Sequence, residues 1–320
     1  MQIPLGSRRR VLAGLAALPV FAVAPRLGAR EINAAFREVE ASLGGRIGVW
    51  AGRAGHEPDL GWRETERFAM CSSFKWLLAA AVLEQVERGS ERLERPVPYG
   101  PKALPPHSPI THAHLAQGAM SVGELAEAAV TQSDNGAANL LLERLGGPPA
   151  LTAFLRRHGD PVTRLDRNEP ELNQALDGDP RDTTTPKAMV GDLARLAFGD
   201  ALNARSKARL VQWMLACRTG DARIRASIPK GLLVGDKTGT GYNGVAGDIG
   251  FVLPGAGCSP LLMAIYVQAP KADPERRDAA IARCAAIVWE NLGRCVRTTT
   301  SENRETVGPD RRNPPGHGAG

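Results

Sequence analysis

The spacing of apolar residues changes along the chain and divides it into segments. Residues 31–45 carry an apolar residue at every third or fourth position, which predicts a helix ending at Gly44 and Gly45. The apolar positions of this helix are Ile32, Phe36, Val39 and Leu43. Residues 45–53, GRIGVWAGR, alternate instead, as strands do. The folded part of the chain is therefore predicted to start with a helix and a strand.

Strand-like alternation returns only near the C-terminal end. Residues 231–241 (GLLVGDKTGTG), 247–254 (GDIGFVLP) and 261–269 (LLMAIYVQA) each predict a strand, and turn residues separate them. A last helix is predicted from about 273 to 296, with one apolar face. That face consists of Ile281, Cys284, Val288 and Leu292.

Residues 66–220 predict helices and loops. Ser121 and Glu124 form a capping box before one helix, and residues 137–147, AANLLLERLGG, end another in glycines. We therefore predict an α/β (α+β) fold in which residues 30–65 and 221–296 form a sheet-containing lobe and residues 66–220 an inserted helical lobe. A cleft between two lobes is a common place for a small-molecule site.

Both chain ends differ from the rest. Residues 1–29 carry Arg8, Arg9 and Arg10 near their start, followed by an apolar run over 11–23 and by small residues up to 29. The run is short for a bilayer span, and the segment predicts a signal peptide of the twin-arginine type. Residues 297–320 are polar and rich in Gly, Pro and charge, which predicts a disordered tail. We expect an exported, periplasmic protein.

The composition excludes several classes of protein. A hydrophobic content of 43% and a charged content of 23% are typical of a soluble globular protein. The formal charge of +6 falls to +2 without residues 1–29, which hold four arginines and no acid. Binding to nucleic acid is therefore not expected, and neither is lasting membrane association once the leader is removed.

Five cysteines are an odd number, and none lie in C-x-x-C spacing, which argues against a disulfide framework and a zinc knuckle. Cys284 and Cys295 fall on the predicted last helix, roughly 16 Å apart, too far to bridge. We predict mostly unpaired, buried thiols. The five are Cys71, Cys217, Cys258, Cys284 and Cys295.

Three short motifs suggest chemistry. Ser72 and Lys75 in MCSSFK lie three residues apart, so on a helix the amine reaches the hydroxyl and can activate it as a nucleophile. A surface lysine would give the same pattern. TQSDNGAAN carries Ser133 and Asn135, although such a triplet is most often a turn or a cap.

The third motif is GDKTGTG. Strand alternation sends neighbouring side chains to opposite faces, and Gly239 leaves room for a ligand along the backbone. An ammonium there could hold a carboxylate, whereas an ordinary strand with a solvated lysine is the plain alternative. The motif supplies Lys237, Thr238, Gly239 and Thr240.

Together, S-x-x-K, S-D-N and K-T-G in this order resemble the motif set of class A β-lactamases and penicillin-binding proteins. The resemblance covers residues 31–296. It implies the two-lobed serine β-lactamase/penicillin-binding-protein-like fold, with an antiparallel five-stranded sheet flanked by helices plus an all-helical lobe. It also implies catalysis without metal or cofactor, on a small-molecule β-lactam, by a protein that we take to be a monomer.

A fourth feature distinguishes hydrolase from transpeptidase. RLDRNEPELN carries Glu169 and Asn173 at the spacing of the class A Ω loop, where a carboxylate and an amide hold water against the acyl-enzyme. Penicillin-binding proteins lack that pair. Arg167 and Asp182 match the arginine and aspartate that staple this loop in the family.

The resemblance implies a role for each position. Ser72 is the nucleophile, Lys75 or Glu169 takes its proton, and Ser133 protonates the departing ring nitrogen. Glu169 with Asn173 then activates water. Backbone amides of Ser72 and Thr240 resemble the oxyanion hole. The positions that resemble substrate-binding residues are Asn135, Lys237, Thr238, Gly239, Thr240, Arg223 and, at the cleft rim, His107.

Some positions depart from relatives. Cys71 precedes the nucleophile as in a carbapenem-hydrolysing subgroup, but Gly241 stands where that subgroup has its second cysteine, so its disulfide is not expected. Asn168 stands where some relatives have tryptophan. The residues GTGYNG match G-x-G-x-x-G but lead into a strand, which predicts a hairpin turn. His112 and His114 form H-x-H without the aspartate of a zinc hydrolase, so no metal is expected.

The sequence thus predicts a β-lactamase that hydrolyses penicillins and cephalosporins through an acyl-enzyme on Ser72, and so confers resistance. Two alternatives share the scaffold. A D-Ala-D-Ala peptidase or transpeptidase leaves Glu169 and Asn173 unexplained. A catalytically silent peptidoglycan-binding protein leaves the filled catalytic positions unexplained.

Overall fold

The computed structural model describes residues 28–56 and 60–295. The predicted signal peptide, apart from its last two residues, and the predicted tail lie outside these ranges. Within them, no helix combines the length and the apolar character needed to cross a membrane.

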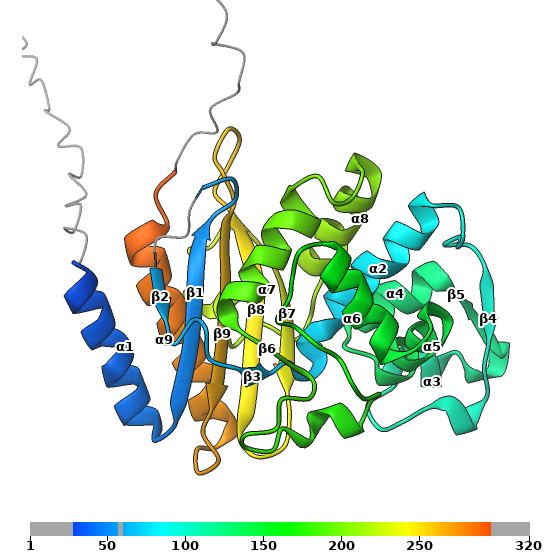
Figure 1. Cartoon of the computed structure of the whole chain (residues 1–320), viewed down its shortest axis with the longest axis horizontal. Helices are drawn as coiled ribbons and strands as arrows, with labels where there is room; N and C mark the ends of the chain where they lie inside the picture. Colours follow the sequence, from blue (N-terminus) through cyan, green and yellow to red (C-terminus); the bar gives the residue numbers. More distant parts are fainter. Residues whose placement is uncertain (1–27, 57–59, 296–320) are drawn as a thin grey trace, which may run out of the picture.

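One antiparallel sheet of five strands organises the molecule, in the order β2-β1-β9-β8-β7 (Figure 1). Its central pairing joins chain segments more than 200 residues apart, since Arg46 on β1 lies opposite Gln268 on β9 and Arg53 opposite Leu261. The strands are β1 (Arg46–Arg53), β2 (Leu60–Trp62), β7 (Leu233–Thr240), β8 (Val245–Leu253) and β9 (Leu261–Gln268).

Helices cover both faces of the sheet. α1 (Ala29–Leu43) and α9 (Pro274–Leu292) pack on one face, while α7 (Pro186–Asp192) packs on the other against β1 and β9. The remaining helices are α2 (Lys75–Glu87), α3 (Pro109–Ala113), α4 (Val122–Thr131), α5 (Asn135–Leu145), α6 (Pro148–Arg157) and α8 (Ala204–Leu215). Short helical turns are η1 (Cys71–Phe74), η2 (Pro101–Ala103), η3 (Leu115–Gln117), η4 (Glu171–Gln174), η5 (Leu193–Phe198) and η6 (Ile224–Ser227).

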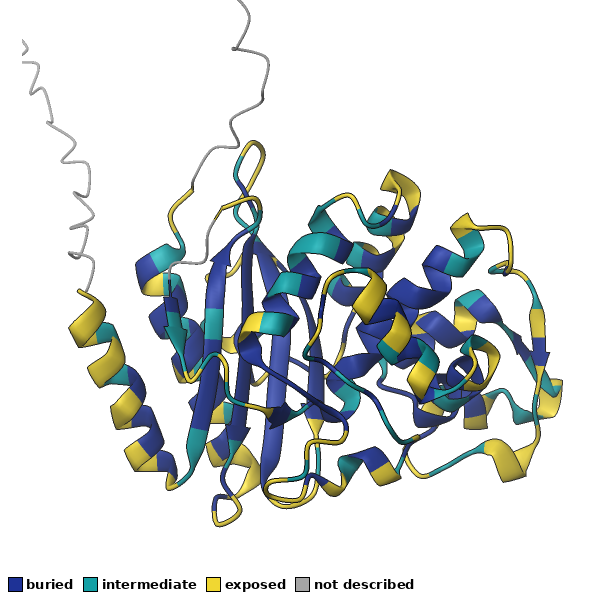
Figure 2. Cartoon of the chain, viewed as in Figure 1, coloured by how far each residue is buried: buried dark blue, intermediate teal, exposed yellow. Residues whose placement is uncertain are grey.

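Side-chain alternation along the strands separates two cores. On β9, Leu262 and Tyr266 face the core shared with the helices from α2 onward, whereas Met263 and Ile265 face the core formed with α1 and α9. The strands are therefore buried on both faces, as the dark sheet of Figure 2 shows. A sheet enclosed in this way is a rigid support for residues at its edge strand β7.

Most predicted elements are confirmed. The first helix, the strand after it, the three late strands and the last helix appear within a few residues of the predicted bounds. The hairpin between β7 and β8 occupies the GTGYNG stretch, and Ser121 and Glu124 form the capping box that starts α4. The fold class is thus the predicted one.

The segment 66–220 is less purely helical than predicted. It contains two small antiparallel pairs, β3 (Phe68–Ala69) with β6 (Thr183–Thr184) and β4 (Pro96–Pro98) with β5 (Ala119–Ser121). These strands are two or three residues long, too short to show a period of two in the sequence. The division into a sheet lobe and a helical lobe stays a prediction.

The prediction of mostly unpaired cysteines is right for three and wrong for two. Cys258 and Cys295 form a disulfide, with their Cα atoms 5.3 Å apart, whereas Cys71, Cys217 and Cys284 are free and buried. Helix α9 ends at Leu292, so Cys295 lies beyond it, next to the β8–β9 turn that carries Cys258. No local sequence motif indicates this pair, because its two cysteines are 37 residues apart and meet only through the tertiary fold.

This disulfide should stabilise the fold without contacting the β7 edge. Closing a loop of 37 residues is worth about 4 kcal/mol in the chain-entropy description. We expect Cys258→Ser to lower the free energy of unfolding in urea by up to that amount. The double variant with Cys295→Ser should be no less stable than the single one, because the bond is already lost. Additive losses, or five titratable thiols in the denatured and unreduced protein, would contradict the bond.

Candidate active site

A tight turn before α2 presents Ser72 and Lys75 together. Cys71 adopts a left-handed φ of 45°, which redirects the chain into η1, and Lys75 is the first residue of α2. The Nζ atom of Lys75 donates to the Oγ atom of Ser72 over 2.9 Å. The predicted nucleophile and amine are therefore in contact.

Lys75 and Glu169 form a fully buried ion pair beside that hydroxyl. Nζ of Lys75 lies 3.0 Å from Oε1 of Glu169, and both side chains have 0% exposure. Ser72 Oγ donates to the same Oε1 over 3.1 Å. Burial lowers the pKa of the Lys75 ammonium, and the Glu169 carboxylate opposes that shift. The serine hydroxyl thus lies within hydrogen-bond distance of an amine and a carboxylate.

Two asparagines hold Glu169. Nδ2 of Asn173 donates to the second carboxylate oxygen, Oε2, while Oδ1 of Asn173 is buried without a partner among the described residues. Asn139 on α5 accepts from the backbone N–H of Glu169 over 3.0 Å and donates to its carbonyl over 2.8 Å. Asn139 was not among the predicted residues, although its place one helical turn after Asn135 puts both on one face of α5.

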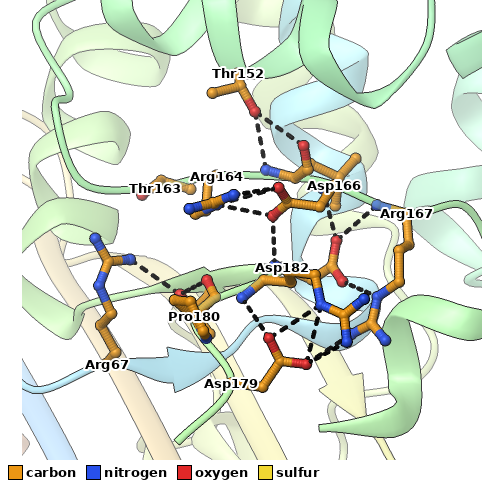
Figure 3. A network of polar contacts seen from close by, with 12 residues as sticks. Arg67, Thr152, Thr163, Arg164, Asp166, Arg167, Asp179, Pro180 and Asp182 are labelled. Atoms are coloured by element: carbon orange, nitrogen blue, oxygen red, sulfur yellow. Dashed lines mark hydrogen bonds and ion pairs between the residues drawn. The ribbon is translucent and has the colours of Figure 1, made fainter.

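The segment 164–182, which carries Glu169, is closed at its base by Asp182 (Figure 3). Asp182 is 0% exposed; its Oδ1 accepts from the backbone N–H groups of Asp166 and Arg167, and its Oδ2 accepts from Arg167 Nε over 2.6 Å. Its carbonyl oxygen accepts from the Met70 N–H, two residues before Ser72. The loop base and the nucleophile turn are therefore directly linked.

The S-D-N stretch closes the opposite side of the site. Ser133 has a φ of 56°, and its carbonyl oxygen accepts from Lys75 Nζ over 2.8 Å. Asn135 Oδ1 also accepts from Lys75, while its Nδ2 donates to the Pro106 carbonyl over 2.8 Å. Asp134 points away from the site, where it caps α5 and accepts three hydrogen bonds from Ile110 and Thr111.

Strand β7 brings a second lysine to the same place. Lys237 is fully buried and donates to Ser133 Oγ over 3.1 Å. Burial, with Lys75 nearby, lowers the pKa of Lys237 to about 8. Gly239 is needed for packing, because a Cβ atom there would lie 2.2 Å from the Met70 carbonyl oxygen. The glycine lets β7 approach the nucleophile turn, a different reason from the predicted room for a ligand.

Arg223 reaches β7 from the segment before η6. It donates to Thr240 Oγ1 over 2.7 Å and to the carbonyl oxygens of Gly239 and Gly247. Its Nε donates to Asp278 on α9 over 2.7 Å. The arginine is thus fixed next to the edge of β7 with its charge partly balanced.

These residues border one cleft of about 420 Å³. Among the predicted residues, the cleft wall contains Ser72, His107, Ser133, Asn135, Asn173, Arg223, Thr238 and Thr240. Lys75, Glu169, Lys237 and Gly239 lie just beneath it, and Arg167 and Asp182 support it from the loop base. The structure therefore brings all the predicted site residues together.

Sequence reasoning missed part of the wall. Thr219, whose Oγ1 lies 2.5 Å from Thr238 Oγ1, and the 65%-exposed Tyr242 both border the cleft. No local pattern indicates Thr219, which precedes an irregular segment. Cys71 is a free thiol, and a Cβ atom at Gly241 would lie 2.5 Å from its sulfur, so position 241 has no room for a side chain unless Cys71 moves.

In the described residues, no three His, Cys, Asp or Glu side chains are grouped closely enough to hold a metal ion. His114 of the H-x-H pair contacts the Ile110 carbonyl through Nδ1 over 2.9 Å.

Comparison with known proteins gives consistent matches. The family described as "Beta-lactamase enzyme family" matches residues 29–292. The carbapenem-hydrolyzing beta-lactamase KPC of Klebsiella oxytoca is 44% identical over 287 residues, which cover 89% of this chain and 97% of that protein.

Solved structures agree with the family match and with the KPC match. A β-lactamase from Desulfarculus baarsii superimposes with a TM-score of 0.80 at 50% identity, over 84% of this chain and 100% of its own. An ancestral class A β-lactamase superimposes with a TM-score of 0.78 at 50% identity, over 81% of this chain and 99% of its own.

The contact between Asp182 and Arg167 at the loop base predicts that replacing the Asp182 carboxylate by an amide lowers the free energy of unfolding substantially. Asp182→Asn removes the charge that pairs with Arg167, and breaking a largely buried pair costs about 3 kcal/mol. We expect a corresponding loss in urea unfolding. Asp177→Asn makes the same change at an exposed position of the same loop and should alter stability by less than about 0.5 kcal/mol. Equal effects of the two would show that the Arg167 contact contributes nothing.

Proposed function

The chain belongs to the class A β-lactamases, which are β-lactam hydrolases, and we propose that it hydrolyses penicillins and cephalosporins through an ester on Ser72. The observation that carries the proposal is the contact of Ser72 Oγ with both Lys75 Nζ and Glu169 Oε1. A hydroxyl between an amine and a carboxylate can lose its proton as it attacks a carbonyl carbon.

In the proposed acylation, Ser72 Oγ attacks the lactam carbonyl while its proton passes to Lys75 or Glu169. The backbone N–H groups of Ser72 and Thr240 stabilise the oxyanion. The lactam C–N bond then breaks, and Ser133 gives its hydroxyl proton to the ring nitrogen. Lys75 and Lys237, both within 3.5 Å of Ser133 Oγ, support that transfer by stabilising the developing alkoxide. The proton lost by Ser72 passes on through Lys75 to Ser133 Oγ, which restores both the base and the Ser133 hydroxyl.

In the proposed deacylation, Glu169 takes a proton from water as the water oxygen attacks the ester carbonyl. Support comes from Asn173, whose buried Oδ1 has no protein partner and whose Nδ2 fixes the carboxylate. A buried amide oxygen is costly to leave unsatisfied, so it favours a bound water beside Glu169. The ester bond breaks, Ser72 regains its proton, and the penicilloic or cephalosporoic acid leaves.

The substrate carboxylate is proposed to bind at the β7 edge. Lys237 and Arg223 supply positive charge there, and the hydroxyls of Thr238 and Thr240 supply hydrogen bonds. Asn135 and His107 line the opposite wall, where the side-chain amide of the substrate would lie. The carbapenem hydrolysis named for one relative is not part of the proposal, because Gly241 leaves Cys71 without a second cysteine.

We also propose export to an oxidising compartment, the periplasm, as a monomer and with a role in β-lactam resistance. The disulfide between Cys258 and Cys295 supports export, because such bonds persist outside the reducing cytoplasm.

A trapping experiment tests the mechanism. Glu169→Ala should slow deacylation by roughly 10² to 10⁴, since it removes a general base. A chromogenic cephalosporin should then leave an adduct on Ser72 that mass spectrometry detects, whereas the parent turns over many times. Glu171→Ala, at an exposed position of the same loop, is the control and should keep parent-like turnover. Rapid turnover by Ser72→Ala would rule out the serine ester. A stable adduct on the parent protein would favour a D-Ala-D-Ala transpeptidase. If neither the parent nor any variant formed an adduct, the result would favour a silent binding protein.

The pH profile tests the role of Lys237. An ammonium is charged below its pKa, so with a pKa of about 8 Lys237 loses its charge as the pH rises through 8. We therefore expect kcat/KM to fall above pH 8. Lys237→Arg keeps the charge at all accessible pH values and should move this alkaline limb above pH 10. A limb that stays near 8 in that variant would assign it to another group, such as Lys75.

A further inference from the structure

A second cavity lies on the sheet face opposite α1 and α9, between β1 and α7. We call it the β1–α7 pocket. Its volume of about 590 Å³ exceeds the 420 Å³ of the cleft, and no residue lines both. β9 and β8 separate β1 from the cleft strand β7, so strands β1 and β7 are roughly 14 Å apart across the sheet.

The floor and one wall of the pocket are apolar. Trp50 on β1 and Leu262 on β9 form the floor, and Val190 and Ala194 line the side of α7 and η5. α7 has only seven residues, and several residues that line the pocket are small, which leaves the space open. These small lining residues are Gly52, Gly159, Ala188 and Gly191.

The rim is strongly basic. Five lining residues carry or can carry positive charge: Arg53, His56, Arg67, Lys187 and Arg195. Lys187 is exposed, and its Nζ lies 5.2 Å from the centroid of the Trp50 ring, with no carboxylate in ion-pair distance among the described residues. Arg67 donates only to uncharged groups, the Val162 carbonyl over 3.1 Å and Thr183 Oγ1 over 2.9 Å. These contacts fix its guanidinium in place without neutralising it.

Among the described residues, acidic groups balance only part of this charge: Arg195 pairs with Asp192 over 2.7 Å, whereas Lys187 and Arg67 have no carboxylate partner. Asp160, the one acid that lines the wall among the described residues, is 1% exposed, and its Oδ1 accepts from the N–H groups of Val162 and Thr163. Asp192 beneath it is fully buried and accepts from Arg195; burial and Asp160 raise the pKa of its carboxyl well above the usual range, and Arg195 opposes that shift. Glu64 accepts from the Lys187 backbone N–H through its carbonyl, and its carboxylate does not line the pocket.

We propose that the β1–α7 pocket binds a small organic anion, a carboxylate or sulfonate on a planar apolar body. The body lies against Trp50 and Leu262, and the anionic group lies between Lys187 and Arg67. A cavity of this volume suits a small molecule, and an apolar floor with a few fixed polar groups is typical of such sites. The inference is independent of the chemistry proposed for Ser72.

Calorimetric titration of the mature, disulfide-bonded protein with 2-naphthalenesulfonate tests the proposal. We expect binding of one probe per chain, at least tenfold weaker in Lys187→Glu. Lys271→Glu makes the same charge change at an exposed position beyond the other end of β9, and it should bind within twofold of the parent. Naphthalene-2-sulfonamide, which has the same body without the charge, should bind at least tenfold more weakly.

A space-filling variant locates the probe. Ala194→Phe extends into the pocket from its apolar wall and should abolish binding, with an unchanged melting temperature as the control for folding. The proposal is overturned if the parent does not bind the probe, if Lys187→Glu and Lys271→Glu bind equally, or if Ala194→Phe binds like the parent. Equal binding by all variants would place the probe elsewhere, such as the Ser72 cleft.

Discussion

A lysine ammonium and a glutamate carboxylate buried together, Lys75 and Glu169, set the main constraint on this structure. Two charges removed from water are tolerated only when their geometry is good and their remaining hydrogen-bonding groups are satisfied. Lys75 meets that condition with Ser72, Asn135 and the Ser133 carbonyl, and Glu169 with Asn173. These partners come from three segments, the turn before α2, the S-D-N stretch and the loop 164–182, so the pair requires these segments to meet at one point.

Those segments need supports of their own. Asp182 closes the loop that carries Glu169 and, through its carbonyl, also holds the turn before Ser72. Asn139 ties the backbone of Glu169 to α5, and Asp134 ties the start of α5 to α3. The cost of left-handed backbone at Cys71, Ser133 and Asp182 is borne by this surrounding network. The regular sheet and helices hold the network in turn.

The sequence predicts the residues of the active site better than it predicts the contacts that hold those residues in place. Ser72, Ser133 and Lys237 lie in motifs whose order carries information, and the strands around β7 alternate clearly. Asn139 contacts backbone atoms of Glu169, and a contact with backbone atoms gives no recognisable pair of residue types in the sequence. The Cys258–Cys295 bond depends on where α9 ends and on which turn faces it, which are tertiary facts. The β1–α7 pocket depends on the shortness of α7, and no pattern of residue types indicates a gap between packed elements.

The pairing of β1 with β9 has a consequence for biosynthesis. A ribosome releases β1 early, but its partner emerges only after more than 200 further residues have been made. Until then one edge of β1 is unpaired and can aggregate, and the sheet lacks its central strand, β9. The last third of the chain therefore acts as a closing step, and a nascent chain that stops before β9 cannot form the sheet, even though every residue in contact with Ser72 has already been translated.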